Sequence, residues 1–381
     1  MVCCSLIPSG CREFGMAKKR KTGQLNMDGR MMFYLVLMLL AACLLIFHSF
    51  VFGNDVMVFG EAGSDTRQQY LMWYNSIVNH IRAGRFSLWD ATNGFGGTMY
   101  NYYLFQPLLV IVYAIGVLFG PQVIPHLMVY VVMANILLSG IFCYLLLCVW
   151  DMDERAKLTT AFLYAFNGYL VVWGQHYGLG AACVWLPLLL MMTELSLRNK
   201  KMYPWVAFGS AITILSGYYQ GYLILLGMAI YGTRRILVYA GGSLKERLTA
   251  YVLTGFSLFS GLLMGAVNLL PSAKSLQVTS RLGSGESLLH RFVRNLAPYE
   301  REYYRTLVYR LLGNNLQGSG VDYLGDANYY EAINLCMGAL LIILGVQFLP
   351  LFFKKHRQLR ERIAVLLGML ISLFLILVKA G

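Results

Sequence analysis

The chain has 381 residues, of which 58% are hydrophobic and only 13% are charged, and its mean hydropathy is +0.58. Soluble domains carry about 25% charged residues because their surface faces water, so this composition excludes an ordinary soluble domain. The formal net charge of +13 does not indicate nucleic-acid binding, because apolar runs near bilayer length indicate the lipid bilayer as the partner of this chain.

Residues 1–30 are polar and include the basic run at 18–21. Because positively charged segments stay in the cytoplasm, we expect a cytoplasmic leader. The apolar run at 31–52 is too long for a signal-peptide core and lacks a small-residue cleavage site, so it is typical of an uncleaved anchor.

Long apolar segments continue along the rest of the chain. In lipid only helices or closed barrels satisfy the backbone polar groups, and these runs lack the period-two alternation of barrel strands. The sequence therefore predicts an all-α, polytopic transmembrane helical bundle. Its expected segments lie at about 31–52, 104–120, 125–150, 157–174, 180–197, 203–217, 219–238, 250–271, 332–353 and 363–380.

Lys and Arg clusters orient these segments, since cytoplasmic loops carry an excess of both residues. If the clusters at 198–201, 234–247 and 354–362 all lie inside, the stretches 53–103 and 272–331 are extracytoplasmic loops. Five full crossings before Arg198 would place its basic cluster outside, so one of these five segments cannot cross the membrane. Our candidate is 104–120, which is short and flanked by prolines; the alternative is that the charge rule fails at Arg198.

The predicted organisation is a leader at 1–30, a transmembrane core at 31–271 and C-terminal helices at 332–381, with the second external loop at 272–331 before them. The last apolar segment reaches Gly381 without a polar tail. We therefore expect the chain to be a truncated form of a longer protein.

The first external loop contains an amphipathic helical pattern. Apolar residues that include Tyr70, Trp73 and Tyr74 recur on one helical face, whereas Arg67 and Asn75 fall on the other. Aromatic residues at this spacing are typical of juxtamembrane helices in the interface. Packing against neighbouring loops gives the same pattern, and both can hold.

Asp65 directly precedes this helix, and two roles suit it. As an N-cap, its carboxylate would satisfy free amides, with Gln68 three residues later completing a capping box. As a general base, it would take a proton from an acceptor hydroxyl beside a lipid-borne donor. The roles are compatible, because capping would hold the carboxylate in position.

Other polar groups are expected on the same outer side. Glycines and aromatics at 89–103 are typical of a compact loop that stacks on sugars or forms an aromatic belt. His176, in a short turn, suits phosphate binding, metal ligation, proton relay or simple hydrogen bonding at a helix end. The turn at 218–222 contains Tyr219 and Gln220, which could line the same cavity.

The loop at 272–331 carries cations such as Arg281 on a side where they are uncommon. They favour an anionic cargo such as a lipid phosphate, although a solvated loop with snorkelling side chains explains them equally well. The eight cysteines lie mostly in apolar runs without C-x-x-C spacing, so neither a disulfide framework nor a structural metal site is expected.

These motifs, in this order, resemble the bacterial YfhO family of membrane proteins. The resemblance begins with Gly63, Asp65, Gln69 and Tyr70 in the first external loop. It continues through the motif at 163–169, His176, and the motifs at 185–188, 217–222 and 330–335. It therefore covers most of the chain from residue 31 onward, and the order is more specific than any single motif.

The resemblance implies a GT-C-type glycosyltransferase fold. Such enzymes transfer a sugar from a polyprenyl-phosphate donor on the outer face of the cytoplasmic membrane, here to a cell-envelope polymer such as a teichoic acid. The acidic residue of the first loop corresponds to Asp65, the expected catalytic group. The expected substrate-binding residues are His176, Gln69, Tyr70, Arg281, Tyr219 and Gln220.

The external face has no supply of nucleotide sugars and the sequence has no Gly-rich phosphate loop, so no nucleotide cofactor is expected; assistance by a divalent metal stays open. The alternatives are a transporter or flippase for a lipid-linked sugar, and a non-catalytic assembly protein. A transporter would carry charged residues deep inside its helices and interrupted helix pairs, whereas the acidic residues and His176 are expected near helix ends.

Overall fold

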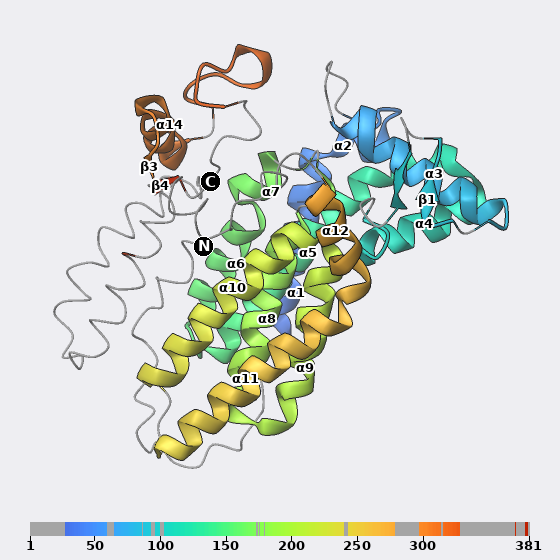
Figure 1. Cartoon of the computed structure of the whole chain (residues 1–381). Coiled ribbons are helices and arrows are strands. Elements are labelled where there is room, and N and C mark those ends of the chain that lie inside the picture. Colours follow the sequence, from blue (N-terminus) through green and yellow to red (C-terminus); the bar gives the residue numbers. More distant parts are fainter. Residues whose placement is uncertain are drawn as a thin grey trace.

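The computed structural model describes residues 27–58, 65–85, 87–92, 96–99, 103–172, 174, 176–178, 180–239, 243–278, 297–313, 315–327, 370 and 378–379. Within these residues the chain is almost wholly helical (Figure 1). Four helices are long and apolar enough to cross a bilayer. The predicted all-α membrane fold is confirmed. The four helices span Gly29–Ile46, Pro121–Val149, Ala181–Arg198 and Leu244–Met264.

The elements follow the predicted segments closely. The helices are α1 (Gly29–Ile46), α2 (His48–Phe52), α3 (Leu71–Arg82), α4 (Pro107–Phe119), α5 (Ile124–Val149), α6 (Glu154–Ala165), α7 (Gly168–Val172), α8 (Ala181–Arg198), α9 (Tyr203–Ser216), α10 (Tyr218–Arg234), α11 (Leu244–Met264), α12 (Ala266–Val278) and α14 (Arg301–Leu312). Shorter turns are η2 (Thr66–Tyr70), η4 (Pro121–Val123), η6 (Lys200–Met202), η7 (Arg235–Tyr239) and η8 (Gly320–Asp322). Two small antiparallel pairs join β1 (Trp89–Asp90) to β2 (Gly97–Thr98) and β3 (Ala297–Pro298) to β4 (Val378–Lys379).

Side-chain caps define several helix ends. The Asp28 carboxylate accepts from the Arg30 amide before α1, and the Gln106 side chain accepts from the Leu109 amide before α4. Ser243 and Glu246 form a capping box at the start of α11. These polar residues satisfy amides that the first helical turn leaves without an intrahelical acceptor.

Helix α4 is shorter than a bilayer is thick. Its 13 residues run from Pro107 to Phe119. Gly120 follows with a φ of +97°, which is outside the helical range and ends the helix. At 1.5 Å per residue it is roughly 20 Å long, against a hydrocarbon core of about 30 Å. Helix α9, with 14 residues, is almost as short, so the interpretation that segment 104–120 does not cross the membrane stays a prediction.

The predicted segment 157–174 is interrupted. Helix α6 ends at Ala165, and α7 begins at Gly168 with Asn167 as its cap, because the Asn167 side chain accepts from the Leu170 amide over 3.0 Å. Asparagine competes for backbone hydrogen bonds and thus favours a cap over a helix interior. Apolar composition alone predicts a continuous helix here, which is wrong.

Basic residues gather at the end of the bundle where α5, α8 and α10 terminate. Arg198 at the end of α8 donates to the Val149 carbonyl at the end of α5 over 2.7 Å. Arg235, at the end of α10, reaches α8 as well. We call this the basic end. The clusters at 198–201 and 234–247 share this end, as expected if both lie on one side of the membrane. The side of the membrane that the basic end faces stays a prediction.

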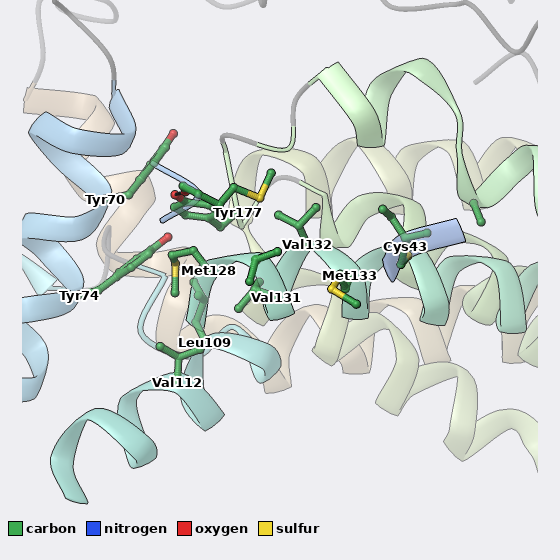
Figure 2. Close-up of a cluster of buried hydrophobic side chains, with 14 of the residues drawn as sticks. Cys43, Tyr70, Tyr74, Leu109, Val112, Met128, Val131, Val132, Met133 and Tyr177 are labelled. Carbon is green, nitrogen blue, oxygen red and sulfur yellow. Dashed lines mark hydrogen bonds between the residues drawn. The ribbon is translucent and has the colours of Figure 1, made fainter. Parts of the chain in front are cut away.

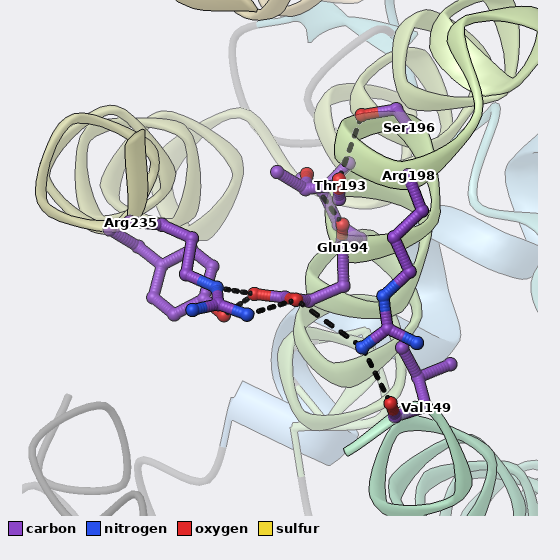
Figure 3. A network of polar contacts seen from close by, with 8 residues as sticks. Val149, Thr193, Glu194, Ser196, Arg198 and Arg235 are labelled. Carbon is purple, nitrogen blue, oxygen red and sulfur yellow. Dashed lines mark hydrogen bonds and ion pairs between the residues drawn. The ribbon is translucent and has the colours of Figure 1, made fainter. Parts of the chain in front are cut away.

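A buried carboxylate ties three helices together at the basic end (Figure 3). Glu194 of α8 is 1% exposed and accepts from Arg235 at 2.5 and 3.0 Å and from the Tyr231 hydroxyl. Arg198 lies 3.9 Å from the same carboxylate and also satisfies Val149 of α5. Burying a charge is costly unless it is paired, and this carboxylate is fully paired.

A second buried pair lies near the basic end, between α5 and α6. Lys157 is 2% exposed and contacts Glu154 at 2.5 Å, and Glu154 accepts from the Tyr144 hydroxyl at 2.9 Å. The lysine also lies 3.8 Å from the Cys148 sulfur. Both buried pairs therefore occupy terminal turns of their helices, where the connecting segments are polar.

Close helix crossings are made at glycines. Gly261 of α11 lies against Ser210 and Ala207 of α9, and Gly140 of α5 lies against Leu39 of α1. Two helices in lipid gain no hydrophobic free energy from each other, so small residues that permit close backbone approach dominate such contacts. Here they set the spacing of the bundle.

Some predicted features lie outside the described residues. These are the leader at 1–26, segment 332–353, and segment 363–380 apart from residue 370 and β4. At Val378–Lys379 the chain forms a strand paired with β3, where the sequence predicts the end of a helix. The cysteines that the structure describes, Cys43, Cys143, Cys148 and Cys183, are free thiols.

We expect Gly261→Ala to destabilise the bundle, because its Cβ would overlap the Ser210 side chain and the Ala207 carbonyl. Overpacking of this kind costs about 1–3 kcal/mol. Gly255→Ala on the same helix meets nothing within 4 Å and should be neutral or slightly stabilising, since alanine favours helix by up to about 1 kcal/mol. Thermal unfolding in detergent compares the two variants; equal midpoints would contradict this packing.

Candidate functional site

The end of the bundle opposite the basic end brings together three segments that are far apart in sequence. They are η2 with α3, the turn before α8, and the turn between α9 and α10. Figure 2 shows Tyr70 and Tyr74 projecting toward Tyr177 of the second segment. We call this the tyrosine end. Tyr70, Tyr74 and Tyr177 are 7%, 0% and 1% exposed.

Tyr70 and His176 form the central contact of the tyrosine end. The Tyr70 hydroxyl lies 2.6 Å from Nδ1 of His176, and the two rings meet edge to face with centroids 5.5 Å apart. Both side chains are buried, and 106 positions separate them in the chain. Two residues predicted for the site are therefore direct partners.

Tyr70 is protonated in its contact with His176. Burial, followed by the negative charge that Tyr103 and Asp65 would present, raises the pKa of Tyr70 far above its usual range. The phenol therefore stays protonated, so its oxygen can donate its proton to Nδ1 of His176 or accept one from it.

Asp65 does not cap its helix through its side chain. Its backbone is already helical, with φ −57° and ψ −31°, and no side-chain cap hydrogen bond forms. An N-cap residue normally has non-helical angles that turn its side chain back to the free amides. The predicted capping box with Gln68 is therefore wrong.

The Asp65 carboxylate has a different partner. Nε2 of Gln69, one turn further along, donates to Oδ1 of Asp65 at 2.6 Å. Asp65 is half-buried and close enough to raise the pKa of Tyr70. Asp65, Gln69, Tyr70 and His176 thus form one continuous group, in which an oriented carboxylate lies beside a hydrogen-bonded tyrosine and histidine.

Tyr103 connects this group to the turn before α8, which contains Gly178, and to the turn between α9 and α10, which contains Gly217. Its ring lies 6.0 Å from the Tyr70 ring, edge to face. A Cβ at Gly178 would lie 2.8 Å from the Tyr103 ring, and one at Gly217 would lie 3.6 Å from it. Tyr103 itself has a φ of +57°, a conformation uncommon for non-glycine residues and concentrated at functional sites.

A small hollow, with room for about one water molecule, is lined in part by these turns. It includes Gln220, the fifth predicted site residue that the structure describes, whereas Asp65 does not line it. The glycines beside Tyr103 form part of its wall, so one aromatic ring separates it from the Tyr70–His176 pair. Its lining comprises Gly178, Ala181, Ala182, Trp185, Thr213, Ser216, Gly217, Gln220 and Ile224.

Two predicted site residues cannot be placed in this way. Arg281 and the side chain of Tyr219 lie outside the described residues, although the Tyr219 backbone belongs to the first turn of α10. Among the described residues, no three His, Cys, Asp or Glu side chains come together as metal ligands.

Asn135 is a residue of the tyrosine end that the sequence analysis does not single out. Its Nδ2 donates to the Tyr177 carbonyl at 3.3 Å, and the Tyr177 hydroxyl donates to the Met57 carbonyl at 2.5 Å. These bonds hold the turn that carries His176 against the first loop. An amide inside an apolar 26-residue helix is a signal for such a role, since polar groups in membrane helices are costly.

Asp90 organises the outer part of the first loop. It is 0% exposed and accepts from the Ser76 hydroxyl at 2.6 Å and from the Thr92 hydroxyl and amide at 2.6 and 2.9 Å. Burial opposes its ionisation, but the hydrogen bonds outweigh burial and hold the pKa of Asp90 below its usual 3.8. Asp90 is a structural carboxylate that links β1 to α3.

We predict opposite outcomes for two neighbouring tyrosines. Tyr70→Phe removes the hydroxyl that pairs with His176 and should destabilise the protein by about 1–3 kcal/mol, the cost of leaving a buried polar group unsatisfied. Tyr74→Phe removes a buried hydroxyl that has no partner among the described residues and should be neutral or stabilising. Thermal unfolding measures both; a larger loss in Tyr74→Phe would contradict the assigned hydrogen bond.

The lowered pKa of Asp90 predicts acid sensitivity of the first loop. Because the folded-state pKa is depressed, this carboxylate stabilises the fold above its ordinary value of 3.8. That stabilisation is lost as pH falls through the lower folded value. Unfolding midpoints measured from about pH 6 to about pH 3 should fall less steeply for Asp90→Asn than for the unaltered protein. The exposed Asp55→Asn should keep the original slope.

A family model described as "Bacterial membrane protein YfhO" matches residues 31–379, most of the chain, which confirms the resemblance found in the sequence. No curated protein and no solved structure matches the chain.

Proposed function

The chain belongs to the YfhO family of bacterial membrane proteins, and from this membership and its tyrosine end we propose that it is a membrane glycosyltransferase. It transfers a sugar from a polyprenyl-phosphate donor to a hydroxyl of a cell-envelope polymer, such as a teichoic acid. The reaction takes place at the outer face of the cytoplasmic membrane, in a GT-C-type fold.

The observation that carries this proposal is the pairing of Asp65 with Gln69 beside Tyr70 and His176. A general base must be held within hydrogen-bond reach of the proton it takes, and its position matters before its pKa does. Gln69 holds one carboxylate oxygen of Asp65, and the carboxylate is half-exposed. The second oxygen suits an acceptor hydroxyl.

The proposed transfer needs no reactant other than the sugar donor and the acceptor. Asp65 takes the proton of the acceptor hydroxyl as its oxygen forms a bond to the anomeric carbon of the donor sugar. The bond between that carbon and the phosphate oxygen breaks, and the electron pair leaves with polyprenyl phosphate. The histidine N–H is suited to a hydrogen bond with the departing phosphate, and Arg281 is a further candidate for phosphate binding.

The charge distribution supports the proposed orientation. Basic residues gather at the end opposite Asp65 and His176, and the basic end of a membrane protein normally faces the cytoplasm. The candidate site then faces outward, where lipid-linked sugars are the available donors. The prenyl chain would lie along the apolar residues that the bundle exposes to lipid.

A transporter or flippase for the same lipid-linked sugar is the second candidate. The break between α6 and α7 at Asn167 favours it, because transporters bind substrates at interrupted helices. The buried pairs of Glu194 and Lys157 do not favour it, since they lie in terminal turns at the basic end. Transfer of a labelled sugar to polymer separates the two candidates.

We predict that Asp65→Asn lowers sugar transfer to the polymer by a factor of about 10²–10⁴, the usual contribution of a positioned general base. The measurement is incorporation of labelled sugar by membranes that contain the full chain. Asn is isosteric and can still accept from Gln69, so the loop should stay folded.

Asp55→Asn is the matched control, because Asp55 lies in the same loop and is exposed. It should leave transfer unchanged. Undiminished transfer by stably inserted Asp65→Asn would refute the catalytic role. Movement of lipid-linked sugar across the membrane without transfer to polymer would instead establish the transporter.

A further inference from the structure

The predicted second external loop contains one amphipathic helix, α14, whose inner face is covered by the segment that follows it. Thr306 and Arg310 of this face are each 1% exposed. The Asp326 amide donates to the Thr306 hydroxyl at 2.8 Å. The Arg310 guanidinium lies over the Tyr323 ring, 4.9 Å from its centroid. The helix and the segment after it therefore fold against each other through their polar and aromatic side chains.

The opposite face of α14 is apolar in its C-terminal half and is exposed. Val308 and Leu312, one turn apart, are 58% and 52% exposed, and the described parts of the chain leave both largely uncovered. Residues three and four positions apart share one face of a helix, and exposed apolar groups of this kind mark interaction surfaces. We call this surface the α14 patch; it comprises Val308, Leu311, Leu312 and Leu316.

A strand pair fixes where α14 begins. β3 pairs with β4 (Figure 1), and only two residues separate β3 from Arg301, the first residue of α14. β4 ends the last apolar run of the sequence, which has no charged residue from 363 to 378. Because Lys379 is the first charge after that run, β4 marks a membrane boundary. At about 3.8 Å per residue, α14 begins within roughly 11 Å of this boundary.

The strand pair is compatible with the predicted topology. β3 belongs to the stretch 272–331, which the charge rule predicts outside. The basic cluster at 354–362 is predicted inside, so the apolar run after it would end outside, at β4. Both strands are thus expected on the same side of the membrane, and the α14 patch is continuous in the chain with a segment that contacts lipid.

The charge of this region does not favour an electrostatic partner. Residues 297–327 contain three arginines and four acidic residues, and Arg305 pairs with Glu302 at 3.4 Å. Attraction to anionic lipid requires a net positive segment. Tyrosine is common here instead, and Tyr299 stacks on Tyr303 with centroids 3.8 Å apart. Tyrosine prefers the headgroup level of a bilayer, so apolar insertion at that level fits the composition.

We propose that α14 lies in the outer interface of the membrane, with the α14 patch inserted among the lipid acyl chains. The insertion is hydrophobic and does not require anionic lipid. An amphipathic helix of this kind buries its apolar face about 5–10 Å below the headgroups. It anchors the second external loop at the level where the phosphate of a lipid lies. This inference goes beyond the proposed function and holds with or without sugar transfer.

The test uses the full chain, one copy per nanodisc, in phosphatidylcholine that carries a photoreactive diazirine near the start of one acyl chain. Mass spectrometry then locates the lipid adducts. We expect adducts within residues 301–316, and also on α11 at Phe256 and Phe259, whose exposed side chains are the reference for lipid contact. Added phosphatidylglycerol or about 1 M salt should change the α14 adducts by less than about twofold, because salt screens only electrostatic attraction.

The variant Val308→Gln with Leu312→Gln separates insertion from mere proximity. Glutamine keeps the helix propensity and the net charge but removes two apolar side chains from the lipid. The adducts within residues 301–316 should fall about tenfold relative to those on α11. Unchanged α11 adducts show that the variant is folded and inserted. Ser319→Gln is the matched control, because Ser319 is exposed in the same segment outside the patch, and it should keep the α14 adducts.

Three results would overturn the proposal. Normal α11 adducts without α14 adducts would place the patch in water. Adducts that need phosphatidylglycerol, or that disappear in high salt, would refute hydrophobic insertion. Cross-links between two chains at α14, in place of lipid adducts when each nanodisc holds two copies, would make the patch a dimer surface. Sugar transfer enters none of these measurements, so the failure of this proposal and the failure of the proposed function are distinguishable.

Discussion

The arrangement of this protein depends on close contact between helices that gain no hydrophobic free energy from one another. Glycines make that contact possible: Gly261 lies against α9, Gly221 against Thr213 and Ile214, and Gly140 against α1. Each crossing fixes the position of one helix along the axis of its neighbour. The positions of the turns at both ends of the bundle are therefore fixed as well. The alignment of Tyr70 with His176 therefore follows from packing far from either residue.

The two ends of the bundle are stabilised by different kinds of interaction. At the basic end, Glu194, Arg235 and Arg198 form a charged network that joins α5, α8 and α10 and satisfies the Val149 carbonyl at the end of α5. At the tyrosine end, neutral phenols, glycines and amides make the contacts. Ion pairs with several partners resist rearrangement, whereas edge-to-face aromatic contacts rearrange at a small cost in free energy. A site that must admit and release a lipid-linked substrate suits the second kind of end.

Sequence reasoning predicted the members of the candidate site better than their roles. Asp65, Gln69, Tyr70 and His176 were all predicted from motifs, and the structure brings them together. The capping box failed because the backbone at Asp65 is already helical, which turns the carboxylate toward Gln69. Tyr103 belonged to the aromatics noted at 89–103, but that pattern did not indicate that its ring lies against the glycines of two distant turns.

The sequence by itself determined that the chain is helical and membrane-embedded, because uncharged runs of this length can satisfy their backbone only within themselves. It also determined where several helices begin and end, through caps such as Asp28, Gln106 and Ser243. Only the tertiary structure decided that Tyr70 shares a hydrogen bond with His176 and that the described residues offer the buried Trp185 indole no partner. The physical reason is that hydrogen-bond pairing across 106 residues depends on helix crossings, and the apolar pattern of a membrane helix does not encode which face meets which neighbour.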